Sequence, residues 1–103
     1  MFAKVTADAM LPTGDGPFVL YAAEDATLGM ADLKKVRTGV RVASLSEGHV
    51  LCVTEMPSGV QTATFAVEPD NAMELCVPVL NGSLRTLEIR AGAPLAHAVV
   101  QRK

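Results

Sequence analysis

Two cysteines and two histidines are the residues whose types could most directly support metal binding or nucleophilic catalysis. Cys52 and Cys76 each lie inside an apolar run, and His49 and His97 are the only other soft ligands. A structural zinc site needs about four such ligands at close spacing, so we expect no metal. Neither thiol has neighbours that would favour a thiolate, so we interpret both as small buried hydrophobic residues. Their disulfide state stays open, because a bridge would require neighbouring strands.

The charge pattern excludes several classes of partner. Nine Lys and Arg against eleven Asp and Glu give a net charge of -2, and the longest cationic run is Lys34-Lys35. A nucleic-acid surface needs a concentrated basic patch, so we expect no nucleic-acid partner. No apolar run approaches the roughly 20 residues of a membrane span, and the first residues lack the apolar core of a signal peptide. We therefore expect no membrane partner and a soluble intracellular protein, or one packaged in a particle assembled inside the cell.

The composition predicts a single domain with more apolar residues than its own core needs. The chain has 103 residues, of which 50% are hydrophobic and only 4% aromatic. A core of Val, Leu, Ala and Met is therefore expected, within one domain that spans residues 1–103. Small apolar domains often complete their core by oligomerising, so we interpret the apolar excess as a subunit interface.

Short apolar segments separated by turn residues predict an all-β architecture, and no segment of ten or more residues shows a helical period. Asn81-Gly82 is a preferred hairpin dipeptide and predicts pairing of the segments on either side, and residues 90–94 predict a second turn. Residues 24–35 are ambiguous, with either a helical turn over residues 30–35 or a loop. Residues 1–16 could form an N-terminal arm that lies along a partner. The expected strands are residues 1–5, 18–23, 36–42, 50–54, 60–67, 75–80, 84–89 and 95–100.

Five segments between Phe18 and Val100 occur in an order that resembles a known family. They read F-V-L-Y-A-A-E-D, V-R-T-G-V-R-V with S-E-G-H, P-S-G-V, V-P-V-L-N-G, and I-R-A-G-A-P-L-A-H-A-V-V. This order and spacing resembles the trimeric dUTPases, whose relatives include the dCTP deaminases. The resemblance implies a β-clip fold, a small distorted antiparallel barrel that forms homotrimers.

The resemblance also indicates where the family's phosphate-binding groups would lie, and two of them are replaced. Val19 stands where the family has the aspartate that orders the magnesium-bound triphosphate. The family's P-R-S-G turn retains only Ser58 and Gly59, with Glu55 nearby and no arginine. A guanidinium is suited to phosphate, whereas a carboxylate would repel it.

The substrate loop departs from the family in a similar way. Glu68 falls on the water-activating aspartate and is one methylene longer, which exceeds the positional tolerance of a general base. Asn71 replaces the tyrosine that packs on deoxyribose, and Met73 replaces a glycine of the base-binding hairpin. Asp70 keeps a carboxylate in this loop. His97 stands where the family has glutamine, and the family's glycine-rich C-terminal arm is not found after Lys103.

These departures predict a non-catalytic dUTPase-like structural or interaction module without a cofactor. We expect a homotrimer that contacts a protein partner, in the first instance as a decoration or cement protein on the capsid subunits of a phage. A viral relative that lost catalysis and gained a host-protein partner is equally compatible. The alternative is a minimal dUTP-hydrolysing enzyme or a nucleotide-binding protein that uses Ser58, Glu68 and Asp70, which otherwise are vestigial turn residues.

The last two expected strands supply the predicted core and interface. On the strand of residues 95–100, we expect His97 to share one face with Leu95 and Val99, and replacing Leu95 or Val99 by Asp should abolish folding or assembly. The full set of predicted core or interface residues is Leu87, Ile89, Leu95, His97 and Val99.

Overall fold

The structure is a computed structural model that describes residues 1–68 and 73–103, and within these residues it contains strands and no helix. The all-β prediction is confirmed. No helix in the described part of the chain is long and apolar enough to cross a membrane. The eleven strands are β1 (Phe2–Lys4), β2 (Phe18–Tyr21), β3 (Ala26–Leu28), β4 (Leu33–Arg37), β5 (Val40–Val42), β6 (His49–Thr54), β7 (Gln61–Thr62), β8 (Phe65–Val67), β9 (Cys76–Leu80), β10 (Leu87–Ile89) and β11 (Pro94–Arg102).

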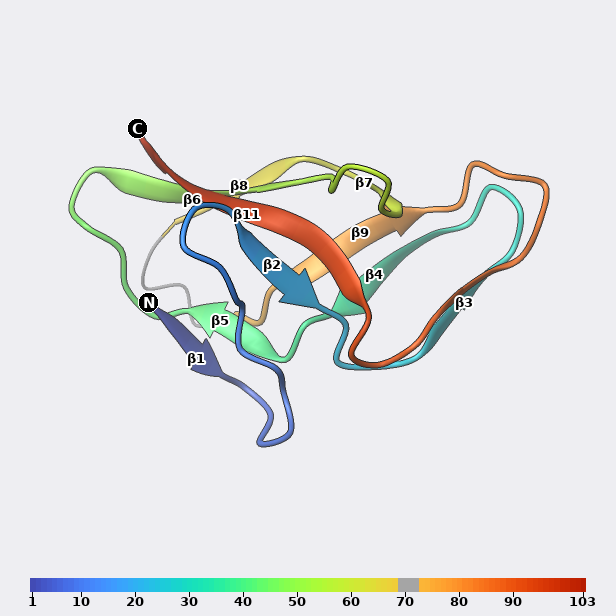
Figure 1. Cartoon of the computed structure of the whole chain (residues 1–103), viewed down its shortest axis with the longest axis horizontal. Coiled ribbons are helices and arrows are strands. Elements are labelled where there is room, and N and C mark those ends of the chain that lie inside the picture. The colour runs from blue at the N-terminus through green and yellow to red at the C-terminus, as the bar shows by residue number, and fades with distance from the viewer. Residues whose placement is uncertain (69–72) are drawn as a thin grey trace.

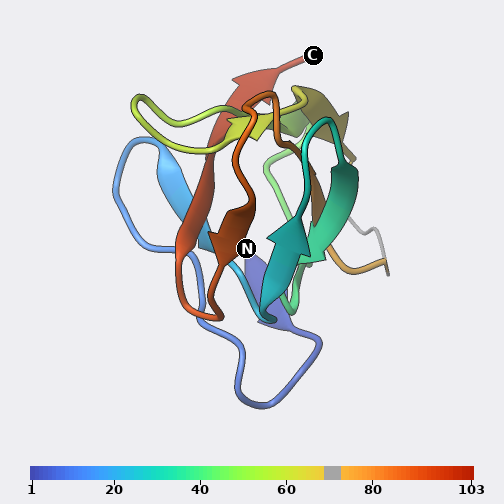
Figure 2. The same cartoon turned by 90° about the vertical axis from the view of Figure 1, so that its right-hand side faces the viewer.

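The strands form four antiparallel sheets around one core (Figure 1). The largest has the order β2-β11-β6-β8, a second has the order β4-β9-β7, and β1-β5 and β3-β10 are two-stranded. Figure 2 shows β3 and β10 side by side, although about sixty residues separate them in the chain. Leu20, Leu51 and Leu95 from the first sheet are fully buried, as are Val36 and Val77 from the second. The alternating apolar residues of both sheets therefore build a shared interior.

The predicted hairpin at Asn81-Gly82 is wrong. β9 pairs with β4 and β7, whereas β10 pairs with β3, with Leu87 opposite Leu28. The physical reason is the Asn81 side chain, which is buried and bonds to backbone groups of the β3 end instead of forming a tight turn. The turn predicted at residues 90–94 is confirmed, because Ala93 N donates to Arg90 O at 2.9 Å.

Three other segments differ from the predicted pattern. The ambiguous segment contains strands β3 and β4 joined by a turn in which Asp32 Oδ2 accepts from Gly29 N at 2.7 Å. Residues 36–42 form two strands rather than one, because the chain breaks at Gly39, where φ is 73°. Val36, Thr38, Val40 and Val42 of this segment are nevertheless all buried. The predicted strand at residues 60–67 is likewise divided, into β7 and β8.

The first sixteen residues make contacts with the body of the chain. β1 pairs with β5, with Phe2 opposite Val42, and Val5 N donates to Gly39 O. Ala9 is buried, and Thr13 forms a bridge with Val19. The role of this segment as an arm along a partner stays a prediction.

Candidate functional site

β11 is the strand around which the candidate site is arranged, and a bulge changes which of its residues face the core. The register shifts between Pro94 and Ala96, so that Leu95 and Ala96 are both fully buried. Beyond the bulge Ala98 is buried, whereas His97 and Val99 are half-buried on the opposite face. The prediction that Leu95 shares a face with His97 and Val99 is therefore wrong, because a bulge shifts the alternation by one residue.

The candidate residues Ser58 and Glu68 lie at opposite ends of β6. Ser58 belongs to the turn that follows β6, whereas Glu68 follows β8, which runs antiparallel to β6 with Val67 opposite Leu51. A strand of six residues spans about 17 Å, so no single substrate group can contact both side chains in one copy of the chain. Asp70 lies outside the described residues.

Ser58 occupies a tight turn with a structural role. Its φ is 59°, and the following amide, Gly59 N, donates to Met56 O at 3.0 Å. Glu55, which precedes the turn, accepts a hydrogen bond from Thr62 N at 3.0 Å. The turn is therefore held by its own backbone and by Glu55, and residues 55–59 present no cation to a phosphate.

Glu68 is engaged by a cation from the end of β11. Lys103 Nζ lies 2.6 Å from Glu68 Oε2, and Lys103 N donates to Gly48 O at 2.8 Å. Both side chains are more than half exposed, so the pair contributes little to stability. It nevertheless directs the carboxylate toward an ammonium group rather than toward a water. Sequence reasoning missed Lys103, because the contact depends on the register of β11 against β6.

Glu74 is the best-connected carboxylate among the described residues, and its contacts are structural. Its two oxygens each lie 3.2 Å from Arg37 Nε, and Oε2 also accepts from Gly39 N at 2.7 Å. The hydrogen bond and charge of Glu74 raise the pKa of Arg37. Burial, followed by the charge of Glu74, raises the pKa of the Cys76 thiol and keeps it protonated. Glu74 therefore fixes the β4–β5 break rather than acting as a general base.

The two cysteines are free and belong to different sheets. Cys52 lies on β6 and Cys76 on β9, and both are half-buried rather than buried as predicted. Cys52 Sγ contacts Gln101 Oε1 at 3.1 Å on the outward face of the four-stranded sheet. The described residues contain no group of three His, Cys, Asp or Glu that could hold a metal ion.

Comparison with solved structures identifies the architecture. A mutant dUTPase from phage phi11 of S. aureus superimposes with a TM-score of 0.89, covering 100% of this chain and 90% of that chain at 18% sequence identity. The chain has the dUTPase fold. A dUTPase mutant from phage 80alpha gives a TM-score of 0.90 over 100% of this chain and 89% of that one, at 16% identity. No protein-family model matches the chain, and no curated protein sequence matches it.

The residues present do not fit the magnesium ion that the dUTPase fold implies. Val19, which the sequence resemblance aligns with the family's metal-ordering aspartate, lies on β2 opposite His97 of β11 and bridges to Thr13. Its apolar side chain offers no oxygen ligand, and hard cations such as Mg²⁺ prefer carboxylate, carbonyl and water oxygens. The nearby Tyr21 hydroxyl is already hydrogen-bonded to Thr13 Oγ1 at 2.7 Å. The side chains around Val19 are therefore suited to packing between strands rather than to holding a divalent cation.

Proposed function

We propose that this chain is a non-catalytic interaction module with the dUTPase fold that works as a homotrimer. One observation carries the proposal: among the described strand residues, the outward face of the four-stranded sheet bears no Asp, Glu, Lys or Arg, and the ion pair of Glu68 with Lys103 lies just beyond the strand ends. An antiparallel sheet with one face in water normally alternates apolar and charged residues, so an uncharged outer face favours coverage by another protein surface. The register assigns to this face Val19, Tyr21, Val50, Cys52, Thr54, Ala66, Pro94, His97, Val99 and Gln101.

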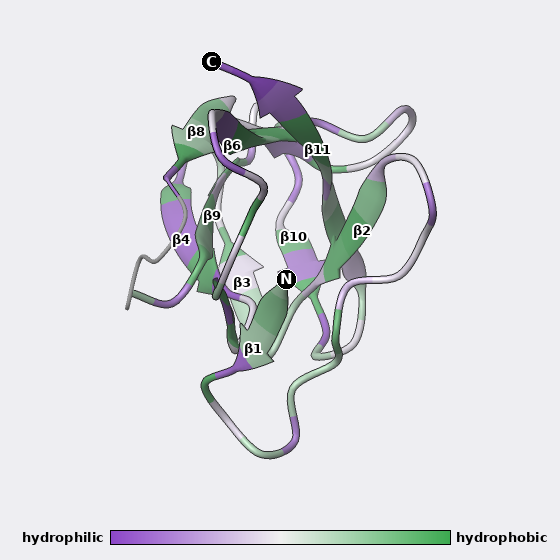
Figure 3. Cartoon of the chain, turned by 90° about the vertical axis from the view of Figure 1, so that its left-hand side faces the viewer, coloured by the Kyte–Doolittle hydropathy of each residue, from purple (hydrophilic) through white to green (hydrophobic). Residues whose placement is uncertain are grey.

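The same face argues against nucleotide chemistry. A triphosphate with its metal requires carboxylates for the ion and cations for the phosphates. Val19 on the edge strand β2 lies opposite His97 of β11, whereas β11 ends at Arg102 and Lys103 follows it, at the hydrophilic C-terminal end of the chain in Figure 3. This distribution is what an apolar protein interface needs rather than a phosphate site.

The partner class that we propose is protein. A phage capsid lattice on which the trimer acts as a decoration protein is the first candidate, and a regulatory host or phage protein is the second. Solved structures of this fold support the second version, because the phage 80alpha dUTPase is described as controlling transfer of virulence genes by a proto-oncogenic G protein-like mechanism. That dUTPase superimposes with a TM-score of 0.87 at 14% identity.

The whole-length similarity to phage dUTPases favours a second candidate function, hydrolysis of dUTP. Because Ser58 and Glu68 lie at opposite ends of β6, an active site that used both would have to form between copies of the chain. Glu68 would then have to leave Lys103 before it could activate a water.

The decisive experiment measures pyrophosphate release from dUTP with magnesium, alongside the mass of the particle by light scattering. We expect no release above background and a trimeric mass. Turnover that disappears in the Glu68→Gln variant would establish the enzyme and contradict our proposal, whereas a stable monomer at micromolar concentration would remove the homotrimer. Absence of the protein from purified phage particles would end the capsid version and leave the regulatory one.

A further inference from the structure

Asn81 and Gly82 are the one Asn-Gly pair in the sequence, and such a pair is chemically reactive. In an unfolded chain the Gly82 amide nitrogen attacks the Asn81 side-chain carbon Cγ, because glycine has no Cβ atom to crowd the approach. The bond from Cγ to Nδ2 breaks, and Nδ2 leaves as ammonia with the proton of the Gly82 amide. One water then opens the resulting succinimide ring to aspartate or to isoaspartate.

The folded chain holds the Asn81 side-chain amide in contacts that this reaction has to break. Nδ2 lies 3.0 Å from both Leu28 O and Gly29 O and 2.7 Å from Arg85 O. Oδ1 accepts from Ser83 N at 3.1 Å and from Ser83 Oγ at 2.8 Å. Attack at Cγ converts a planar amide carbon into a tetrahedral one, so Oδ1 and Nδ2 must leave the plane in which they make these contacts. The contacts must therefore open before the Gly82 nitrogen can react.

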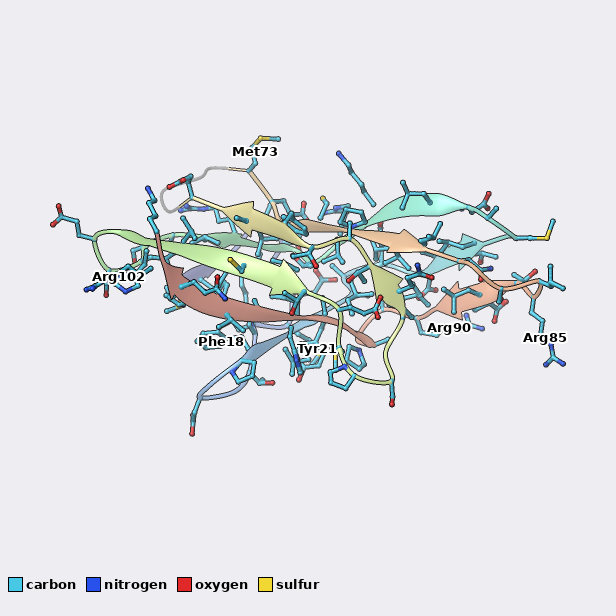
Figure 4. The ribbon with its side chains drawn as sticks, turned by 90° about the horizontal axis from the view of Figure 1, so that it is seen from above. Phe18, Tyr21, Met73, Arg85, Arg90 and Arg102 are labelled. Atoms are coloured by element: carbon cyan, nitrogen blue, oxygen red, sulfur yellow. The ribbon has the colours of Figure 1, made fainter. Side chains whose placement is uncertain are left out.

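The backbone of Asn81 is fixed as well, although the loop that follows it lies at the surface. Asn81 N donates to Asp32 O and Ala31 N donates to Asn81 O, each at 2.9 Å, which joins the β3–β4 turn to the end of β9. Asn81 is 3% exposed, whereas residues 82–86 are all exposed, and the Arg85 side chain points away from the body of the molecule in Figure 4. An exposed nucleophile thus lies beside a buried electrophile, and local opening of the loop controls their reaction.

Neither product of the reaction fits the site that Asn81 fills. An aspartate carboxylate has no N–H to donate to the three carbonyl oxygens that Nδ2 contacts, and its negative charge would face them. Burying a charge without a partner is strongly unfavourable. Isoaspartate lengthens the main chain by one carbon atom, so it would displace either the end of β9 or the loop before β10.

We propose that Asn81-Gly82 is a modification site protected by the fold: unfolding allows Asn81 to deamidate, and deamidation prevents the chain from folding again. Folded molecules keep their asparagine, whereas chains that stay open are converted into a form that cannot return to the native structure. Water is the only co-reactant. Because the reaction depends on the fold alone, it goes beyond the proposed function and applies whether or not the chain is an interaction module.

The first test compares the deamidation rate of the folded protein with that of the unfolded protein. The full chain is kept at mildly alkaline pH with a reducing agent, either in buffer or in guanidinium chloride. Conversion of Asn81 is followed by peptide mass spectrometry and by the release of ammonia. We expect Asn81 to react at least about 100-fold more slowly in the folded protein, because a stable small domain opens in only a small fraction of molecules. Similar rates in the two states would overturn the proposal.

Asp15-Gly16 is a matched control within the same chain. This pair forms the same succinimide, with loss of water instead of ammonia, but both residues are exposed in the loop before β2. A Cβ atom at Gly16 would have nothing within 4 Å, so the loop leaves the pair room to react. Isomerisation of Asp15 should therefore proceed at similar rates in the folded and the unfolded protein. Protection of Asp15 as strong as that of Asn81 would show that the Asn81 contacts are not the cause, and would contradict the proposal.

The second test asks whether deamidated chains can refold. Chains aged in guanidinium chloride should recover the native circular dichroism spectrum only in proportion to the Asn81 that remains. Gly82→Ala chains aged in the same way should recover fully, because a Cβ atom slows the attack on Asn81 and in the fold would meet only the flexible Gln61 Oε1, at 3.0 Å. Complete recovery of deamidated chains, or equal loss in the Gly82→Ala chains, would overturn the proposal. Pyrophosphate release from dUTP would instead contradict the proposed function and leave the modification site standing.

Discussion

Asn81 is the residue whose contacts explain the topology of this half of the molecule. Its side chain is 3% exposed, and Nδ2 lies 3.0 Å from both Leu28 O and Gly29 O and 2.7 Å from Arg85 O. The two hydrogens on Nδ2 are shared among these three carbonyl oxygens, and Oδ1 accepts a hydrogen bond from Ser83 N. One buried amide therefore connects the ends of β3 and β9 to the loop before β10.

Replacing Asn81 by Ala should lower the free energy of unfolding by about 2–4 kcal/mol, because buried carbonyls lose their donor and a cavity is left. For a domain of this size the midpoint of thermal unfolding should fall by at least about 8 °C, as measured by circular dichroism. Ser83→Ala is the control and should cost less than about 1.5 kcal/mol, because Ser83 is exposed. Equal losses in the two variants would show that the Asn81 amide has no special role.

The Cys76 thiol should make both its own alkylation rate and the stability of the protein depend on pH, in a direction that can be tested. Burial and Glu74 raise the pKa of its thiol, whereas Arg37 lowers it. In the Cys52→Ser variant, the pH profile of alkylation should lie at higher pH in the folded protein than in urea. Stability should correspondingly fall as the pH rises above the unfolded thiol's pKa of about 8.5, because the unfolded state releases its proton first.

The neighbouring charges provide the control for that profile. Glu74→Gln should move the alkylation profile toward lower pH and Arg37→Gln toward higher pH, since the two side chains act on the thiolate with opposite signs. Shifts in the same direction would mean that loosening of the fold, rather than charge, governs the reactivity of Cys76.

At the scale of the elements, the sequence predicted which segments are strands better than where they break or with what they pair. Period-two alternation was sufficient for the strand type of β6, which buries alternate residues, and of the part of β11 that follows the bulge. It could not show that β10 joins β3, because that pairing depends on contacts between residues distant in the chain. It also could not locate the β11 bulge, since Leu95 and Ala96 are both apolar and fit either face.

The break between β4 and β5 depends on Gly39. Its φ is 73°, and a Cβ atom there would lie 2.7 Å from Ala9 Cβ and from Thr6 Oγ1. Gly39→Ala should therefore destabilise the protein by about 2–5 kcal/mol, combining left-handed strain with overpacking, as measured by urea denaturation. The N-terminal segment that packs on this turn should lose protection from hydrogen exchange first.

Gly16→Ala is the matched control for this prediction. A Cβ atom at Gly16 would have nothing within 4 Å, and its φ lies outside the left-handed region. The change should stay within about 0.5 kcal/mol of the parent protein. A Gly39→Ala protein as stable as the Gly16→Ala protein would show that residues 6–9 can move away from the turn without cost.

For the whole molecule, the fold was predictable and the candidate site only in part. The order of weak motifs led to the dUTPase fold, which the superposition on phage dUTPases confirms. The sequence placed Ser58 and Glu68 in one family pattern, but their separation by the length of β6 follows only from the antiparallel register. The ion-pair partners of Lys103 and Glu74 could not be predicted, because they lie on other segments of the chain.

Two single variants, each with Asp at a different position of β11, distinguish an effect on assembly from an effect on folding. Leu95 is fully buried, so Leu95→Asp places an unpaired carboxylate in the core at a cost comparable to the whole stability of a small domain, and the protein should not fold. Val99 is half-buried on the uncharged outward face, so Val99→Asp should fold with an unchanged circular dichroism spectrum but scatter light as a monomer.

Val5→Asp introduces the same charge on a valine that is 46% exposed and lies outside this face, and it should leave both folding and assembly unchanged. Val99→Asp that remains trimeric would show that the outward face of the four-stranded sheet is not where the copies meet. In that case the protein partner itself would have to cover the uncharged outward face, and the trimer would have to form through another surface. A folded Leu95→Asp protein would instead contradict the bulged register that places Leu95 in the core.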